Sequence, residues 1–334
     1  HLLHVRQLLD LADQAGIDPQ RITVFASDGA DPGADLAVRL GNREAAWRLA
    51  GTPLFAALRP VRFADSTLPG FTLQPATRAA LDAWFAGPAR RLGAGDVLLL
   101  YVTDHGERNP ADPADNTITL WGEGETLSVS ALRALLAGLD PGVRVVALMS
   151  QCFSGAFAGI ATAHTTAAGL PAGAACGYFS STRNRPAYGC YPENLGRENV
   201  GHSFDFFQGL AASGSFPAAH AHTLVEDATP DVPLRTSELF LQEQLQAEAR
   251  RRGVPLWQFA DELLAEAWRD RGRHAAEIRL LDRIGEAFGF FSPRSLAELR
   301  EQKSRLPQIS AHLARVATAW KFARGDANRA ALQD

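Results

Sequence analysis

The sequence predicts an α/β fold: an open, mostly parallel sheet with helices on both of its faces. Two continuous apolar runs carry this prediction, Asp96–Thr103 (DVLLLYVT) and Val143–Met149 (VRVVALM). Runs without polar alternation are typical of strands that are buried on both faces of a parallel sheet. Helical periodicity before and between them supplies the covering helices. Ligands bind such sheets beyond the carboxyl ends of the strands, so the polar residues after each run are candidate site residues.

The remaining elements of the first two-thirds follow from periodicity, caps and turn residues. Ser128 is a good N-cap for a following helix, and Gly93 and Gly95 stop a helix before the first apolar run. In chain order we expect a helix over 2–15, a short strand Arg21–Ala26, an irregular stretch over 41–74, a helix Pro75–Leu92, a short strand or hairpin arm Asn116–Trp121, a helix over 129–138, and a weaker strand Ala174–Ser180.

From about residue 234 the pattern changes to amphipathic helices rich in Arg, Glu and Ala. We expect these helices over 235–251, 255–270, 273–288 and 294–322. The chain therefore divides into an α/β domain over 1–233 and a helical C-terminal extension over 234–334, with the boundary within 226–235 (EDATPDVPLR).

Composition excludes several classes of function. The 334 residues are 46% hydrophobic and 21% charged, as in an ordinary globular protein, and the net charge is −4. No basic field draws the chain to nucleic acid or to an anionic membrane. No run of 18 or more apolar residues predicts a membrane span, and no signal peptide is visible, so we expect a cytoplasmic location.

The three cysteines, Cys152, Cys176 and Cys190, show no zinc-ligand spacing, and we expect reduced thiols, with a Cys176–Cys190 bridge left open. His220-Ala221-His222 has no third ligand at metal spacing, so surface-loop histidines are the better interpretation. The loop with Asp28, Asp31 and Asp35 does not have the spacing of a calcium loop. The sequence therefore predicts neither a metal nor a cofactor.

Residues that can carry chemistry follow both apolar runs. The first run ends in Asp104-His105-Gly106, and the second is followed by Ser150-Gln151-Cys152-Phe153-Ser154-Gly155. A histidine base near a cysteine makes the thiol a strong nucleophile. Gly106 lets its N–H approach a substrate, and with the Cys152 N–H it would form an oxyanion hole. A structural cysteine and an ordinary loop histidine are the alternative, but their place at two strand ends favours catalysis.

These motifs resemble the clan CD cysteine peptidases, which include caspases, metacaspases, gingipains, separase and legumain. The chain is most similar to legumain, whose "VYFTDHG" is matched by LYVTDHG over 100–106 and whose "EACESGSM" is matched by SQCFSGAF over 150–157. Its "GIP-x-x-Q-I" run resembles GIDPQRI over 16–22, and its "YATTAANPRESSYACY" resembles the frame that starts at Tyr178. The resemblance spans roughly residues 1–245. It implies a caspase-like α/β/α sandwich and a cysteine endopeptidase that acts on a protein or peptide.

The same resemblance implies substrate-binding roles for Ser150, Ser180, Ser181 and His202. Legumain selects asparagine with acidic residues at the positions of Ser150 and His202, so an asparagine preference is not carried over. Arg183 or Arg185 could serve an acidic P1 residue, and Asp205 or Glu198 a basic one, although each can equally be a solvated loop charge. Asp104 is not expected to orient His105, because neighbouring side chains on a strand point to opposite sides.

Two expectations concern partners and role. The resemblance places a central strand before the helix over 2–15, so we expect an N-terminal fragment of the same polypeptide to complete the sheet and to bring a substrate-binding arginine. The enzyme would act in regulated proteolysis or defence. The alternative is a catalytically idle caspase-like scaffold or regulatory protein.

Overall fold

The computed structural model describes residues 1–39, 61–162, 175–188, 201–227, 229, 231–287, 294–298 and 300–301. The chain divides into two compact units, His1–Leu239 and Phe240–Asp334. Each unit is described by itself.

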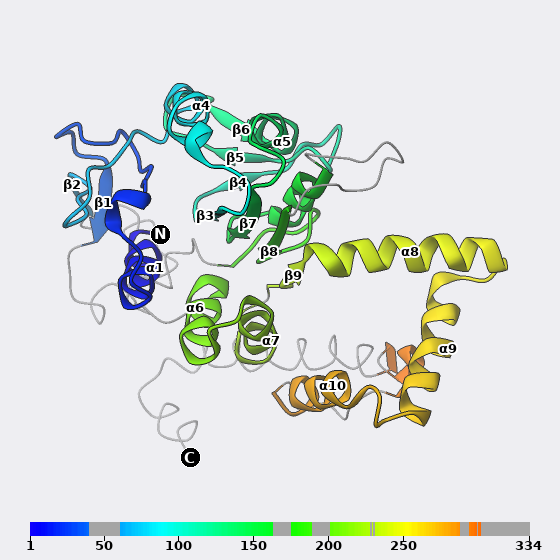
Figure 1. Cartoon of the computed structure of the whole chain (residues 1–334). Coiled ribbons are helices and arrows are strands. Elements are labelled where there is room, and N and C mark those ends of the chain that lie inside the picture. The colour runs from blue at the N-terminus through cyan, green and yellow to red at the C-terminus, as the bar shows by residue number, and fades with distance from the viewer. Residues whose placement is uncertain are drawn as a thin grey trace, which may run out of the picture. The chain divides into compact units, whose positions relative to one another are not determined.

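A four-stranded sheet organises the first unit (Figure 1). Its strands are β3 (Val97–Val102), β7 (Arg144–Met149), β8 (Ala175–Phe179) and β9 (Leu234–Arg235), in the order β3-β7-β8-β9. The first three strands are parallel, and β9 is antiparallel to β8. The predicted α/β class with an open, mostly parallel sheet is therefore confirmed.

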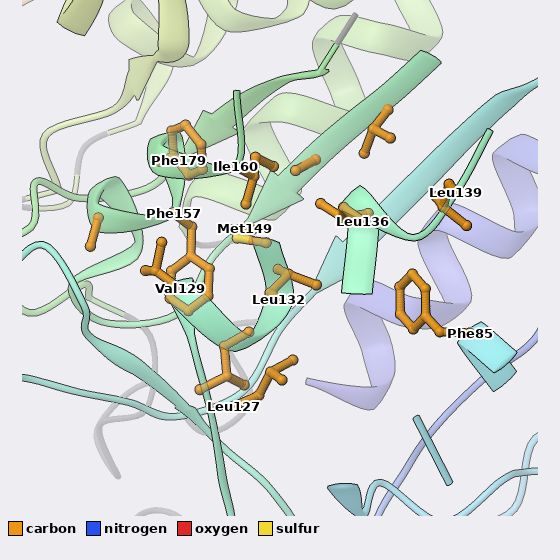
Figure 2. Packing of buried hydrophobic residues seen from close by; sticks show 14 of the residues in the cluster. Phe85, Leu127, Val129, Leu132, Leu136, Leu139, Met149, Phe157, Ile160 and Phe179 are labelled. Carbon is orange, nitrogen blue, oxygen red and sulfur yellow. The ribbon is translucent and has the colours of Figure 1, made fainter. Parts of the chain in front are cut away.

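Alternate residues of β7 enter two different hydrophobic clusters, one on each face of the sheet. Val145, Ala147 and Met149 face a cluster that includes Phe85, Leu132, Leu136, Phe157 and Ile160 (Figure 2). Val146 and Leu148 face the other cluster, which includes Phe206, Phe207 and Ala219. Because successive strand residues point to opposite faces, this division places helices on both sides of the sheet.

The helices that cover the first face are α4 (Arg78–Ala86), α5 (Val129–Ala137) and the 3-10 helix η3 (Ser154–Thr162). The other face is covered by α1 (Leu2–Gln14), α6 (His202–Ser213) and α7 (Phe216–Glu226), as Figure 1 shows. Ser128 caps α5 as predicted, with its hydroxyl accepting a hydrogen bond from the Ala131 N–H.

Smaller elements complete the unit. A three-stranded antiparallel sheet, β4 (Gly106–Glu107), β5 (Thr117–Thr119) and β6 (Thr126–Ser128), continues the chain directly after β3. The strands β1 (Leu36–Arg39) and β2 (Val61–Ala64) pair with each other antiparallel. The 3-10 helices η1 (Pro19–Arg21) and η2 (Pro88–Arg91) are short.

Two predicted elements differ in the structure. The strand Arg21–Ala26 is wrong as a strand, because it is reduced to one β-bridge between Phe25 and Gln74. The single helix Pro75–Leu92 is also wrong: α4 ends at Ala86, and η2 begins at Pro88. Proline cannot donate a backbone hydrogen bond and excludes helical geometry for the residue before it, so the helix breaks at Gly87.

The expected burial of β3 on both faces is wrong as well. Val97 is 46% exposed and Leu99 41% exposed, and both lie on one face of β3, while Leu98, Leu100 and Val102 on the other face pack against the core. Within the described ranges no strand pairs with the outer side of β3. The strand expected there from an N-terminal fragment stays a prediction.

The second unit continues α8 (Thr236–Arg252), and α9 (Leu256–Arg269) and α10 (Ala275–Ala287) follow. Three of the four expected helices thus have counterparts, while most of 294–322 lies outside the described residues. Among the residues that the structure describes, no helix combines the length and the apolar character needed to cross a bilayer.

Candidate active site

Cys152 follows the end of β7. The Ser150 N–H donates to the Val102 carbonyl, which extends the pairing of β7 with β3 by one residue, and Cys152 comes two residues later. Its side chain is partly buried. The Sγ atom accepts a hydrogen bond from the Ala187 N–H at 3.3 Å and lies 3.6 Å from the Ala187 carbonyl oxygen. The loop that follows β8 therefore lies directly against the thiol.

The chain turns sharply after Cys152. Phe153 has φ of 60°, a left-handed conformation that is sterically costly for a bulky residue, and such strain persists where the surroundings impose it. Here the Phe153 N–H donates to the Arg185 carbonyl at 3.0 Å, and the Asn116 amide lies 3.4 Å from the Phe153 carbonyl. The turn sends the chain into η3 and leaves Cys152 at its apex.

Asn116 connects these loops by hydrogen bonds, and its side chain is fully buried. Its Nδ2 donates to the Arg183 carbonyl at 2.9 Å, and its Oδ1 accepts from the Asn109 N–H at 2.9 Å. One amide thus holds the histidine-side loop, the cysteine turn and the loop after β8. Sequence reasoning placed Asn116 only at the start of a strand.

The segment with His105 contacts the segment with Cys152 at Gly106. A Cβ added to Gly106 would lie 2.1 Å from the Cys152 carbonyl oxygen and 3.0 Å from the Gln151 Cγ. The backbone that follows His105 therefore packs against the backbone of Cys152 at a distance that only glycine allows. His105 itself is exposed, and its ring makes an edge contact with the His1 ring at 6.0 Å between centroids. The structure thus brings the two motifs together, as the parallel pairing of β3 and β7 leads us to expect.

Two backbone N–H groups are available beside the thiol. The Thr119 N–H donates to the His105 carbonyl, while the His105 N–H donates to the Asp104 carboxylate, so one of the two bonds of a hydrogen-bonded pair joins His105 to Thr119. In an antiparallel ladder the next pair, Gly106 with Ile118, is then a non-hydrogen-bonded one, which directs the Gly106 N–H away from β5. The Cys152 N–H has no acceptor within the described part of the chain. An N–H without an internal acceptor can bind an external one, as an oxyanion hole requires, and that role stays a prediction for both groups.

The electrostatics of the site keep the thiol neutral at rest. Burial raises the pKa of Cys152, and the hydrogen bond from Ala187 lowers it in part. The negative charge of Asp231 raises the pKa of Cys152 further. Asp231 lies in the loop between α7 and β9, far from Cys152 in sequence, and sequence reasoning missed it.

Asp104 supports the histidine loop through its backbone. Its Oδ1 accepts a hydrogen bond from the His105 N–H at 2.7 Å. Burial raises the pKa of Asp104, and the hydrogen bond from His105 opposes that rise. The hydrogen bond that the structure shows for this carboxylate is to the His105 main chain, and the absence of a triad role for Asp104 stays a prediction.

Ser150 and His202 lie together, but inside the protein. The Ser150 Oγ is 3.2 Å from the His202 Nδ1 and 2.6 Å from the Ser203 Oγ, to which the Tyr101 hydroxyl donates at 2.8 Å. His202 is 2% exposed, and burial lowers its pKa to about 3. The contacts shown are internal, so the substrate-binding role of these two residues stays a prediction.

Ser180 and Ser181 are also buried, at the end of β8. The Ser180 hydroxyl donates to the Gln151 carbonyl at 3.3 Å, and the Ser181 hydroxyl donates to the Arg185 carbonyl at 2.9 Å. Both side chains therefore hold the loops around Cys152 in place, and direct contact with a substrate stays a prediction for them too.

The other candidates divide as follows. Arg183 and Arg185 have exposed side chains, Asp205 is buried on α6, and Glu198 and Cys190 lie outside the described residues. Cys176 is an exposed free thiol.

The expectation of surface-loop histidines at 220 and 222 is wrong, because both lie on helix α7. His220 is buried and pairs with Glu238 at 3.2 Å. Within the described ranges, no group of three potential ligand side chains has the geometry to hold a metal ion.

Comparisons with known proteins add little to this geometry. No family model matches the chain, and no curated protein matches it. Among solved structures, the protein GSU0716 from Geobacter sulfurreducens is similar over 48% of this chain and 72% of its own, with 19% identity and a TM-score of 0.35. A similarity of that size supports no conclusion about fold or function.

Proposed function

We propose that the chain is a cysteine endopeptidase in which Cys152 is the nucleophile and His105 its general base, acting on a protein or peptide substrate in the cytoplasm. One observation carries the proposal. Gly106 packs against the Cys152 carbonyl with no room for a side chain, at the ends of two adjacent parallel strands. A structural cysteine and an unrelated histidine loop would not need that close approach.

The mechanism follows from the groups around the sulfur. As the Cys152 sulfur attacks the scissile carbonyl carbon, its proton passes to the His105 imidazole, and the carbonyl oxygen takes the negative charge. The N–H groups of Gly106 and Cys152 would hold this oxyanion. The intermediate collapses when His105 returns the proton to the leaving amine and the C–N bond breaks. Water, deprotonated by His105, then cleaves the thioester and restores the thiol.

The raised pKa of Cys152 fits this order of events. A thiol that is neutral at rest needs a base during its attack, and His105 supplies one. The Ala187 N–H already points at the sulfur, so it would stabilise negative charge as the proton leaves.

Active-site labelling tests the proposal. An acyloxymethyl ketone peptide probe should label the wild type and should fail to label Cys152→Ala, which should also cleave no member of a peptide library. Cys176→Ala is the matched control, because it removes another free thiol and should keep both labelling and cleavage. Cleavage by Cys152→Ala above a few per cent of wild type would rule Cys152 out as the nucleophile.

A catalytically idle scaffold is the competing proposal, because a thiol that burial and the Asp231 charge keep protonated is a weak nucleophile unless a base acts on it. An idle protein would cleave nothing in the library, and iodoacetamide would alkylate its protonated Cys152 thiol only slowly. Cleavage that depends on Cys152 would exclude it. A role in regulated proteolysis or defence belongs to the same proposal and depends on the substrate that is found.

A further inference from the structure

The carboxylate of Asp231 and the sulfur of Cys152 accept hydrogen bonds from two consecutive residues of the loop after β8. The Asp231 Oδ1 accepts a hydrogen bond from the Tyr188 N–H at 2.5 Å, and the preceding residue, Ala187, donates its own N–H to the Cys152 sulfur. The Val232 N–H donates to the Ser180 carbonyl at 3.2 Å, which fixes the Asp231 loop against the end of β8. Two independent backbone contacts therefore hold this carboxylate beside the site.

The other oxygen of Asp231 is unsatisfied. Its Oδ2 is buried and has no hydrogen-bond partner among the described residues, and the same is true of the Oδ2 of Asp227, whose side chain is 5% exposed. A buried carboxylate oxygen without a donor is costly, and native proteins rarely leave one empty. Among the described residues no donor reaches either oxygen, so a donor from a bound molecule would satisfy the Asp231 carboxylate.

The charges around this place are mostly negative. Burial and the charge of Asp227 both raise the pKa of Asp231, to about 7, and Arg185 is the cation that opposes them. A cation from outside would relieve the repulsion and supply the missing donor. A metal ion is the weaker candidate, because no three potential ligand groups in the described ranges are arranged to hold one.

A basic side chain of the substrate satisfies both requirements. The substrate's P1 residue carries the carbonyl that the Cys152 sulfur attacks, so its side chain starts beside the sulfur and the nearby Asp231 is within the reach of a long side chain. An arginine guanidinium donates several hydrogen bonds in one plane and loses hydration more readily than an ammonium. An acidic P1 residue would instead meet the carboxylate with like charge.

We propose that Asp231 is the specificity-determining residue of the site and selects a basic P1 residue, with arginine preferred to lysine. This inference rests on the proposed peptidase function.

The experiment uses peptides that differ only at P1, with arginine, lysine, citrulline, asparagine or aspartate. Citrulline matches arginine in shape and lacks its charge. The wild type should prefer arginine to citrulline by about 100-fold in kcat/KM, the effect of losing one charge-assisted hydrogen bond in a desolvated site. Asp231→Asn should lose most of that preference and should cleave the citrulline peptide within about threefold of wild type.

Asp205→Asn is the matched control, since Asp205 is another buried carboxylate whose pKa burial and the charges of Asp227 and Glu226 raise to about 7. It lies on α6 and should retain the preference for arginine. If Asp205→Asn lost the preference and Asp231→Asn kept it, the assignment to Asp231 would be overturned.

The outcomes separate the two proposals. Cleavage that depends on Cys152 but favours asparagine, aspartate or citrulline at P1 would overturn the role of Asp231 and leave the peptidase function standing. No cleavage of any peptide by the wild type would overturn both. If Asp231→Asn does not fold, as thermal unfolding would show, the ratio of arginine to citrulline in the wild type still decides whether P1 is selected by charge.

Discussion

Replacing Gly106 by alanine tests the backbone contact on which the proposed active site depends. The added Cβ would lie 2.1 Å from the Cys152 carbonyl oxygen and 3.1 Å from the Cys152 carbonyl carbon. These neighbours are backbone atoms, which cannot rotate out of the way like a flexible side chain. Either the His105-Gly106 segment or the Cys152 turn must therefore move.

The size of the movement sets the size of the effect. Relief of the overlap requires about 1.4 Å of displacement between the two motifs, since the added Cβ lies 2.1 Å from the oxygen and atoms in van der Waals contact lie about 3.5 Å apart. A misplacement of about 1 Å at a catalytic group costs on the order of 100-fold in rate. Overpacking of a well-packed region costs about 1–3 kcal/mol in the free energy of unfolding. We expect both losses for Gly106→Ala.

The assay measures kcat/KM on a cleaved peptide together with the urea midpoint of unfolding. Gly93→Ala is the control: it makes the same substitution near the other end of β3, where a Cβ would meet no atom within 4 Å. It should leave activity unchanged. Gly106→Ala with wild-type activity and stability would refute the reasoning, because the two backbones would then not be in contact in solution.

Three further predictions follow from neighbouring groups. His105→Ala should lower kcat/KM by at least about 100-fold, the usual loss of a positioned base, with no change in melting temperature; an unchanged rate would show that His105 is structural. Asn116→Ala should lower the free energy of unfolding by about 1–3 kcal/mol in urea, because it leaves buried backbone groups of three loops without partners. Burial raises the pKa of Asp205 to about 7. Between the ordinary pKa of an aspartate and pH 7, the folded protein therefore binds one more proton than the unfolded chain. The free energy of unfolding falls as pH rises through that window. Asp205→Asn should therefore be more stable than wild type at pH 8, by on the order of 2 kcal/mol in the free energy of unfolding, and this difference should be smaller at pH 5. A difference that does not change with pH would contradict the reasoning.

Much of the fold could be predicted from local patterns. The apolar runs of β3 and β7 are recognisable because most of their side chains pack into one of two clusters. Ser128 predicts the start of α5 because its hydroxyl accepts a hydrogen bond from an N–H of the first turn. The motifs at His105 and Cys152 were visible for a related reason: parallel pairing brings the ends of neighbouring strands to one edge.

Other features depend on contacts that the sequence does not display. Asp231 follows Cys152 by a long stretch of chain and meets it only because β9 returns antiparallel beside β8. The exposure of Val97 and Leu99 depends on what covers their face of β3, which apolarity alone cannot reveal. His220 was expected on the surface because helix α7, which buries it, was not anticipated.

The charge that would select the substrate also acts on the nucleophile. Asp231 raises the pKa of Cys152, so the empty site holds its thiol more firmly protonated than the site would without that carboxylate. A cationic P1 side chain bound at Asp231 would cancel this effect at the moment when the thiol must lose its proton. The preference for arginine over citrulline should therefore appear in kcat as well as in KM, because part of the electrostatic gain develops only as the sulfur becomes negative. Single-turnover rates at saturating peptide measure that part directly, and equal acylation rates for the two peptides would contradict the coupling between Asp231 and Cys152.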